Sequence, residues 1–111
     1  MKNKMIRAVM LLACCVLTAH AGRIVNVYGQ TETWYNLRMN RVVSNANNKL
    51  GYSSPYWIRE DGCKMYGNFI IVAADYNYHP YGSLVMTSRG VGIVLDTGAF
   101  KGEQYDLAVN W

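Results

Sequence analysis

The sequence of 111 residues holds few of the side chains that cross-link a small fold or ligate a metal: three cysteines and two histidines. Two of the cysteines and one histidine lie in an N-terminal segment that we expect to be removed. Residues 22–111 then keep only Cys63 and His79. One cysteine excludes an internal disulfide, and this pair cannot supply the ligands of a typical zinc site. We therefore expect no disulfide and no metal centre, and interpret Cys63 as a small, semi-buried residue rather than a nucleophile.

The N-terminal segment lacks an apolar run long enough to span a bilayer. Its run AVMLLACCVL covers residues 8–17, whereas a spanning helix takes about 20 residues. Three basic residues precede the run, and Ala19-His20-Ala21 follows it as a small-residue cleavage signature. This layout is typical of a secretory signal peptide. We predict a signal peptide at residues 1–21 and a single secreted or cell-envelope domain at residues 22–111.

A second interpretation of this segment places a lipid on Cys14. LLAC, residues 11–14, loosely resembles a bacterial lipobox, in which the cysteine becomes the lipidated N-terminus. Leu12 is unusual at its place, however, and the apolar run continues past Cys14. Cleavage after Ala21 fits better, and the protein then has no membrane partner; a lipid anchor at Cys14 stays the alternative.

Beyond this segment the chain has little excess charge of either sign. The whole sequence has a formal net charge of +4, but its first 21 residues carry three basic side chains and no acidic one, which leaves +1 for residues 22–111. So small a charge gives no argument for nucleic acid binding. The chain also has no glycine-rich loop of the kind that cradles phosphates. We expect no nucleic acid partner and no cofactor.

A long 3.6-residue period is also missing, and short apolar or alternating segments take its place. Segments with strand character cover residues 23–29, 31–37, 63–66, 69–75, 83–88, 91–96 and 105–111. NANNKLGYSSP, residues 45–55, is polar and rich in turn formers, so we interpret it as a loop. Close strand spacing without helices predicts an all-β fold, a small barrel or sandwich.

Three aspartates, Asp75, Asp96 and Asp106, lie in or at the ends of predicted strands. Alternation places each on a face that otherwise carries small or apolar residues. Carboxylates gathered in such surroundings have perturbed pKa values, because burial and like charge both oppose ionisation. Asp75 and Asp96 could equally be ordinary turn formers. Asp106 lies within a strand and has no turn to serve, so it is the strongest candidate for a functional carboxyl group.

The segments around these aspartates resemble the 3D domain, a family named for three aspartates. In order along the chain they are VAAD (72–75), PYGS (80–83), LDTGAFKG (95–102) and YDLAV (105–109). The resemblance covers residues 70–111, and TETWYNL, residues 31–37, loosely matches the family's Thr- and Tyr-rich opening strand. The family includes MltA-type lytic transglycosylases of bacterial cell walls and small secreted Firmicute proteins.

This resemblance implies a six-stranded double-psi β-barrel and, in members that are enzymes, cleavage of peptidoglycan. The bond cleaved is the β-1,4 link between N-acetylmuramic acid and N-acetylglucosamine. One carboxylic acid protonates the glycosidic oxygen and, once ionised, helps deprotonate the sugar's 6-hydroxyl, which attacks the anomeric carbon. The product is a 1,6-anhydro sugar. The expected partner is therefore a peptidoglycan glycan strand, bound by a monomer.

The resemblance also assigns site residues by position. Asp106 corresponds to the acid/base, and Asp96 and Asp75 correspond to the pair that supports it and adjusts its pKa. Thr97 and Gly98 are expected to shape the turn after Asp96.

Three further residues are candidates for contact with the substrate: Lys101 for an acetamido or carboxylate group, and Tyr76 and Tyr81 for sugar rings. Two differences from the family pattern stand out. The loop between Asp96 and Asp106 is one residue shorter, because the second glycine after Asp-Thr-Gly is missing, and Tyr76 replaces a usual proline.

Two other functions remain open. The domain could bind cell-wall glycan without cleaving it, on aromatic residues that include Tyr76, Tyr78, Tyr81 and Trp57. It could also be an interaction or inhibitor protein that shares only the fold, since a fold does not dictate a function. If the carboxylates of Asp75, Asp96 and Asp106 do not converge in one groove, the enzyme hypothesis loses its physical basis.

Overall fold

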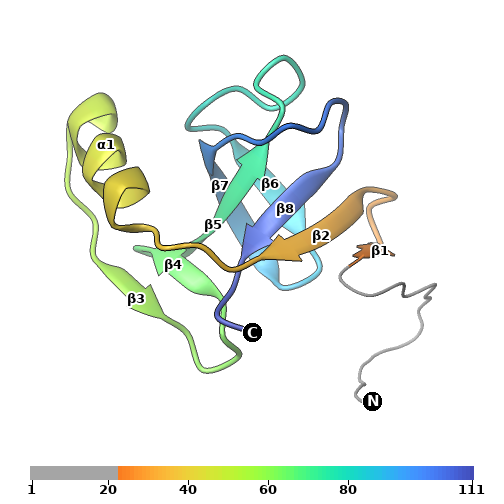
Figure 1. Cartoon of the computed structure of the whole chain (residues 1–111), viewed down its shortest axis with the longest axis horizontal. Helices are drawn as coiled ribbons and strands as arrows, with labels where there is room; N and C mark the ends of the chain where they lie inside the picture. The colour runs from red at the N-terminus through yellow and green to blue at the C-terminus, as the bar shows by residue number, and fades with distance from the viewer. Residues whose placement is uncertain (1–22) are drawn as a thin grey trace.

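The computed structural model describes residues 23–111, which form a mainly β structure with one α-helix (Figure 1). The strands are β1 (Arg23–Val25), β2 (Thr31–Tyr35), β3 (Tyr56–Ile58), β4 (Lys64–Tyr66), β5 (Phe69–Ala74), β6 (Leu84–Thr87), β7 (Gly90–Asp96) and β8 (Tyr105–Ala108). The helix, α1, spans Asn40–Leu50. The expected signal peptide and the alternative lipid site at Cys14 lie outside the described residues. Within them, no helix combines the length and the apolar character needed to cross a membrane.

The strands form one mixed sheet. Its main path runs β1-β2-β8-β5-β4-β3, while β7 pairs with the other side of β5, and β6 pairs with β7. Two pairs, β2–β8 and β5–β7, are parallel, and the remaining pairs are antiparallel. Among the described strands, β1, β3 and β6 each have a single partner, so backbone pairing leaves the sheet open. The eight strands and the open sheet differ from the six-stranded closed barrel that was expected.

The central strands are buried on both faces, because a separate apolar cluster covers each face. One cluster includes Val72, Val94 and Leu107. The other lies on the face that carries α1 and includes Ile71 and Ala108. Burial on both faces explains why FIIVAA in β5 is apolar at every position rather than alternating.

The predicted loop at residues 45–55 is wrong over its first half, and so is the expected absence of a helix. Met39, Val42, Val43, Ala46 and Leu50 follow a helical period, and they pack together on the sheet. Asparagines and β-branched valines mask this period, because both are poor intrinsic helix formers. Packing of the fully buried Ala46 and a left-handed Gly51 at the C-terminal end stabilise the helix instead. The short strand β3 was also missed.

Side chains bridge the gap that the backbone leaves between β2 and the β6–β7 hairpin. Glu32 of β2 is fully buried and accepts hydrogen bonds from the Ser88 N–H (2.6 Å) and the Ser88 hydroxyl (2.7 Å). The Asn26 amide also donates to Glu32, at 2.5 Å. The Tyr105 hydroxyl donates to the Met86 carbonyl oxygen of β6. These bonds join the two ends of the curved sheet without a shared strand ladder.

Candidate functional site

Asp96 and Asp106 lie in one row across four neighbouring strands. In this row Thr33 of β2 is opposite Asp106 of β8, Asp106 is opposite Ala73 of β5, and Ala73 is opposite Asp96 of β7. Residues directly opposite in a sheet share a face. That face carries α1, since Ala108, two residues after Asp106, packs in the cluster beneath the helix. The two carboxylates are therefore on the same side of the sheet.

A β-bulge brings Asp96 to this face. Val72 of β5 pairs with Val94, but the next residue, Ala73, pairs with Asp96, so Leu95 is an extra residue in β7. Alternation along the sequence groups Asp96 with Val94, whose side chain packs in the opposite cluster. The bulge reverses this assignment, which is a common use of bulges near functional sites.

The carboxyl group of Asp106 is about half buried, and its pKa is raised above the ordinary value. Burial is the largest cause, because it disfavours the charged form, and the negative charge of Asp96 adds to it. The Thr33 hydroxyl donates a 2.7 Å hydrogen bond to Asp106 and partly opposes the shift. The site thus keeps a proton on Asp106 to higher pH than an exposed aspartate would.

Tyr35 of β2 is hydrogen-bonded to Asp96 and lies close enough to Asp106 to be affected by its charge. Its hydroxyl donates to Asp96 Oδ2 at 3.1 Å. Burial, then the charge and hydrogen bond of Asp96, then the charge of Asp106, raise the pKa of Tyr35 far above its usual value. The hydroxyl therefore stays protonated and remains a donor. Asp96 also accepts a 2.9 Å bond from the Thr97 N–H.

Thr33 and Tyr35 were not among the predicted site residues. Both lie in TETWYNL, whose match to the opening strand of the family was the available signal. Their spacing of two residues places them on one face of β2. The parallel pairing of β2 with β8, which joins segments more than 70 residues apart, is what sets that face beside Asp106.

Asp75 has separate surroundings. It follows β5 at the surface and accepts 3.0 Å hydrogen bonds from the N–H groups of Asn77 and Gly102. The Gly102 bond is the largest cause that lowers the pKa of Asp75, and the charge of Lys101 also contributes. Asp75 therefore anchors the loop after β7, and the expected grouping of three aspartates is found only for Asp96 and Asp106, which share a face of the sheet.

Nowhere in residues 23–111 do three His, Cys, Asp or Glu side chains gather closely enough to hold a metal ion.

The other predicted site residues lie either in the exposed loop after β7 or beside Asp96. Thr97, Gly98 and Lys101 are exposed in the loop after β7. Tyr76 and Tyr81 lie beside Asp96: their rings meet edge to face at 5.9 Å between centroids. Burial raises the pKa of both hydroxyls, and the charge of Asp96 adds to this effect. The carboxylate pair is therefore bordered by aromatic rings.

Lys49 extends this border onto α1, with its Nζ 4.6 Å from the centroid of the Tyr81 ring.

Cys63 is fully buried, and burial raises the pKa of its thiol to about 11. A thiol in this state is a poor nucleophile. The interpretation of Cys63 as a packing residue agrees with this environment.

No family model matches the chain, and no curated protein matches it either. The chemistry of the site must therefore be argued from its geometry. A carboxyl group with a raised pKa, a second carboxylate on the same face and a border of aromatic rings is an arrangement suited to acid/base chemistry.

Proposed function

We propose that this protein is a small secreted lytic transglycosylase of the 3D-domain type, which cleaves peptidoglycan between N-acetylmuramic acid and N-acetylglucosamine. The observation that carries the proposal is the state of Asp106: half buried, with a raised pKa, and on the same face as Asp96 with only Ala73 between them in the row. A raised pKa favours the protonated form that a general acid needs.

The proposed reaction uses Asp106 twice. Its protonated carboxyl group donates to the glycosidic oxygen as the bond to the anomeric carbon breaks. The carboxylate so formed accepts the proton of the muramic acid 6-hydroxyl, whose oxygen bonds to the anomeric carbon and closes the 1,6-anhydro ring. Burial, with a smaller contribution from the charge of Asp96, favours the protonated form of Asp106 for the first step. No water is consumed, unlike in ordinary glycoside hydrolysis.

Family membership and the double-psi β-barrel are part of this proposal. The order of the three aspartate motifs supports them. The two parallel pairs, β2–β8 and β5–β7, also require crossover connections rather than a simple meander, as a double-psi barrel does, although backbone pairing leaves this sheet open. Asp75 supports the site through the loop that it binds at Gly102.

The test is digestion of purified peptidoglycan, with anhydromuropeptides measured by mass spectrometry. We expect product from the wild-type protein and a loss of at least 100-fold in Asp106→Asn, since removing an acid/base group costs about 10²–10⁴-fold. Glu103→Gln is the matched control, because Glu103 is exposed on the loop before β8 and loses the same charge. Retained activity in folded Asp106→Asn would overturn the assignment of the acid.

The second candidate is a glycan-binding module without catalysis. Exposed aromatic rings favour it, since Tyr78 and Trp57 remain 55% and 43% exposed and Tyr76 borders the carboxylate pair. Sedimentation of the protein with intact cell walls, with no anhydromuropeptide released by the wild type, would support this candidate over the enzyme.

A further inference from the structure

The outer edge of β6 is unpaired in the described sheet. The Val94 N–H donates to the Ser83 carbonyl, and β6 continues in register with β7, so the backbone groups of Val85 and Thr87 also face β7. The groups of Leu84 and Met86 point the other way. The Met86 carbonyl accepts the Tyr105 hydroxyl, while Leu84 N–H, Leu84 C=O and Met86 N–H have no partner among the described residues.

This edge lacks the features that usually prevent strand pairing. Proteins protect exposed edges with charged residues, proline or bulges. LVMT has none of these, and its register with β7 is regular. The side chains of Leu84 and Met86 are about half exposed, at 56% and 46%. Apart from the Met86 carbonyl, which already accepts the Tyr105 hydroxyl, the backbone groups of Leu84 and the Met86 N–H are therefore available to a short further strand.

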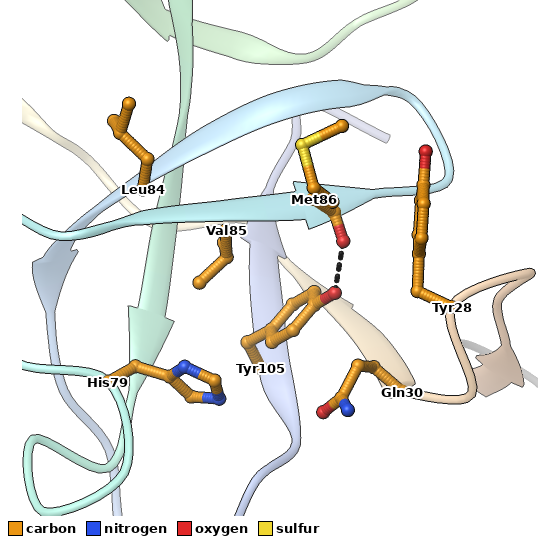
Figure 2. Close-up of a pocket in the computed structure, with 7 residues that line it drawn as sticks. All are labelled: Tyr28, Gln30, His79, Leu84, Val85, Met86 and Tyr105. Atoms are coloured by element: carbon orange, nitrogen blue, oxygen red, sulfur yellow. Dashed lines mark hydrogen bonds between the residues drawn. The ribbon is translucent and has the colours of Figure 1, made fainter.

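A cavity of about 260 Å³ lies directly beside the edge (Figure 2). Val85 and Tyr105 point toward one another across it, and His79 and Gln30 lie opposite β6. The volume is below the roughly 300–1,000 Å³ of sites for drug-sized ligands, which suits one side chain better than a whole ligand. None of the residues that line the cavity is Asp, Glu, Lys or Arg.

We infer that the β6 edge and this cavity bind an extended, uncharged peptide, which adds to the sheet beside β6 and places one apolar side chain in the cavity. Backbone hydrogen bonds at such an edge provide affinity, and an adjoining pocket provides sequence preference. The uncharged lining favours an uncharged segment.

This site is separate from the carboxylate pair. Tyr105 and Asp106 are consecutive in β8, so their side chains project to opposite faces of the strand. Tyr105 packs in the cluster opposite α1. A variant that loses peptide binding can therefore keep glycan cleavage, and the reverse also holds.

The experiment selects uncharged octapeptides from a display library on the purified protein and measures their affinities. Leu84→Pro removes the free N–H, and proline is tolerated where a strand's N–H faces away from its neighbour. Leu84→Thr keeps the N–H and is the matched control. We expect selected peptides to bind wild type and Leu84→Thr similarly, and to bind Leu84→Pro about tenfold more weakly or worse.

A second measurement does not depend on the proline variant. On addition of a selected peptide, the amide signals of Leu84 and Met86 in wild-type protein should shift and their hydrogen exchange should slow. The inference is overturned by any of three results: no peptide is enriched, these amides do not respond, or β6 is occupied by self-association in sedimentation experiments.

Discussion

At the scale of single residues, the partly buried position of Asp106 makes the stability of the folded protein depend on pH. Its pKa is higher in the folded protein than in the unfolded chain, mainly because of burial. Within the pH range between the two pKa values the folded state holds more protons, so stability falls as pH rises. The destabilisation is absent below the unfolded pKa of about 3.9 and complete above the folded pKa.

We therefore expect Asp106→Asn to raise the melting temperature at pH 7 and to have little effect at pH 3. An asparagine keeps an oxygen that can accept the Thr33 hydroxyl, so the contact with Thr33 is retained. Thermal melts of both proteins from pH 3 to pH 8 provide the measurement. A difference between them that stays constant with pH would contradict a buried, titrating carboxyl group at this position.

At the scale of elements, the pairing of β5 with β7 positions Asp96, and it depends on a close approach at Gly92. A Cβ atom at Gly92 would lie 2.6 Å from Val72 Cγ2 and 3.3 Å from the Ile70 carbonyl oxygen. Both neighbours are fully buried in β5 and have little room to move. Gly92 is thus required by packing rather than by an unusual backbone angle.

Gly92→Ala should lower the free energy of unfolding by about 1–3 kcal/mol, the usual cost of overpacking a core. Gly98→Ala is the comparison, since its new Cβ would meet only the ring of Phe100, a side chain in a loop. We expect Gly98→Ala to change stability by less than about 0.5 kcal/mol. Urea denaturation measures both, and equal effects would show that the β5–β7 contact is not the cause.

At the scale of the whole molecule, Glu32 joins β2 to the β6–β7 hairpin that backbone pairing leaves apart. No lysine or arginine forms a salt bridge with it in residues 23–111, where the recorded salt bridges involve only Asp61. Its three hydrogen bonds, from Asn26 and twice from Ser88, therefore stabilise the buried group. Loss of the side chain would leave the Ser88 N–H without its acceptor and the Asn26 amide with the Tyr105 hydroxyl alone.

Glu32→Ala should reduce the free energy of unfolding by about 3 kcal/mol, since three hydrogen bonds to a fully buried side chain are lost at once. Ser88→Ala removes the hydroxyl bond alone and should cost about 1 kcal/mol. Chemical denaturation of the two variants gives both values. If Glu32→Ala costs no more than Ser88→Ala, the closure of the sheet does not depend on Glu32.

Several local features of the fold can be predicted from the sequence. The strands around Phe69–Ala74 and Gly90–Asp96 were expected because their apolar runs are short and bounded by turn residues. Asp106 is the strongest candidate in the sequence because it lies within a predicted strand and has no turn to serve. The helix at Asn40–Leu50 was missed, since its stability comes from packing of Ala46 and its neighbours on the sheet rather than from helix propensity.

The sequence by itself determined the mainly β character and the candidate aspartates, because alternation, turn residues and apolar runs act over a few neighbouring positions. Only the tertiary structure decided which aspartates share a face of the sheet. The bulge at Leu95 placed Asp96 on the face of Asp106, the β2–β8 pairing brought in Thr33 and Tyr35, and Asp75 instead bonds the Gly102 N–H in the loop after β7. These outcomes depend on contacts between segments far apart in the chain, and no local period encodes them.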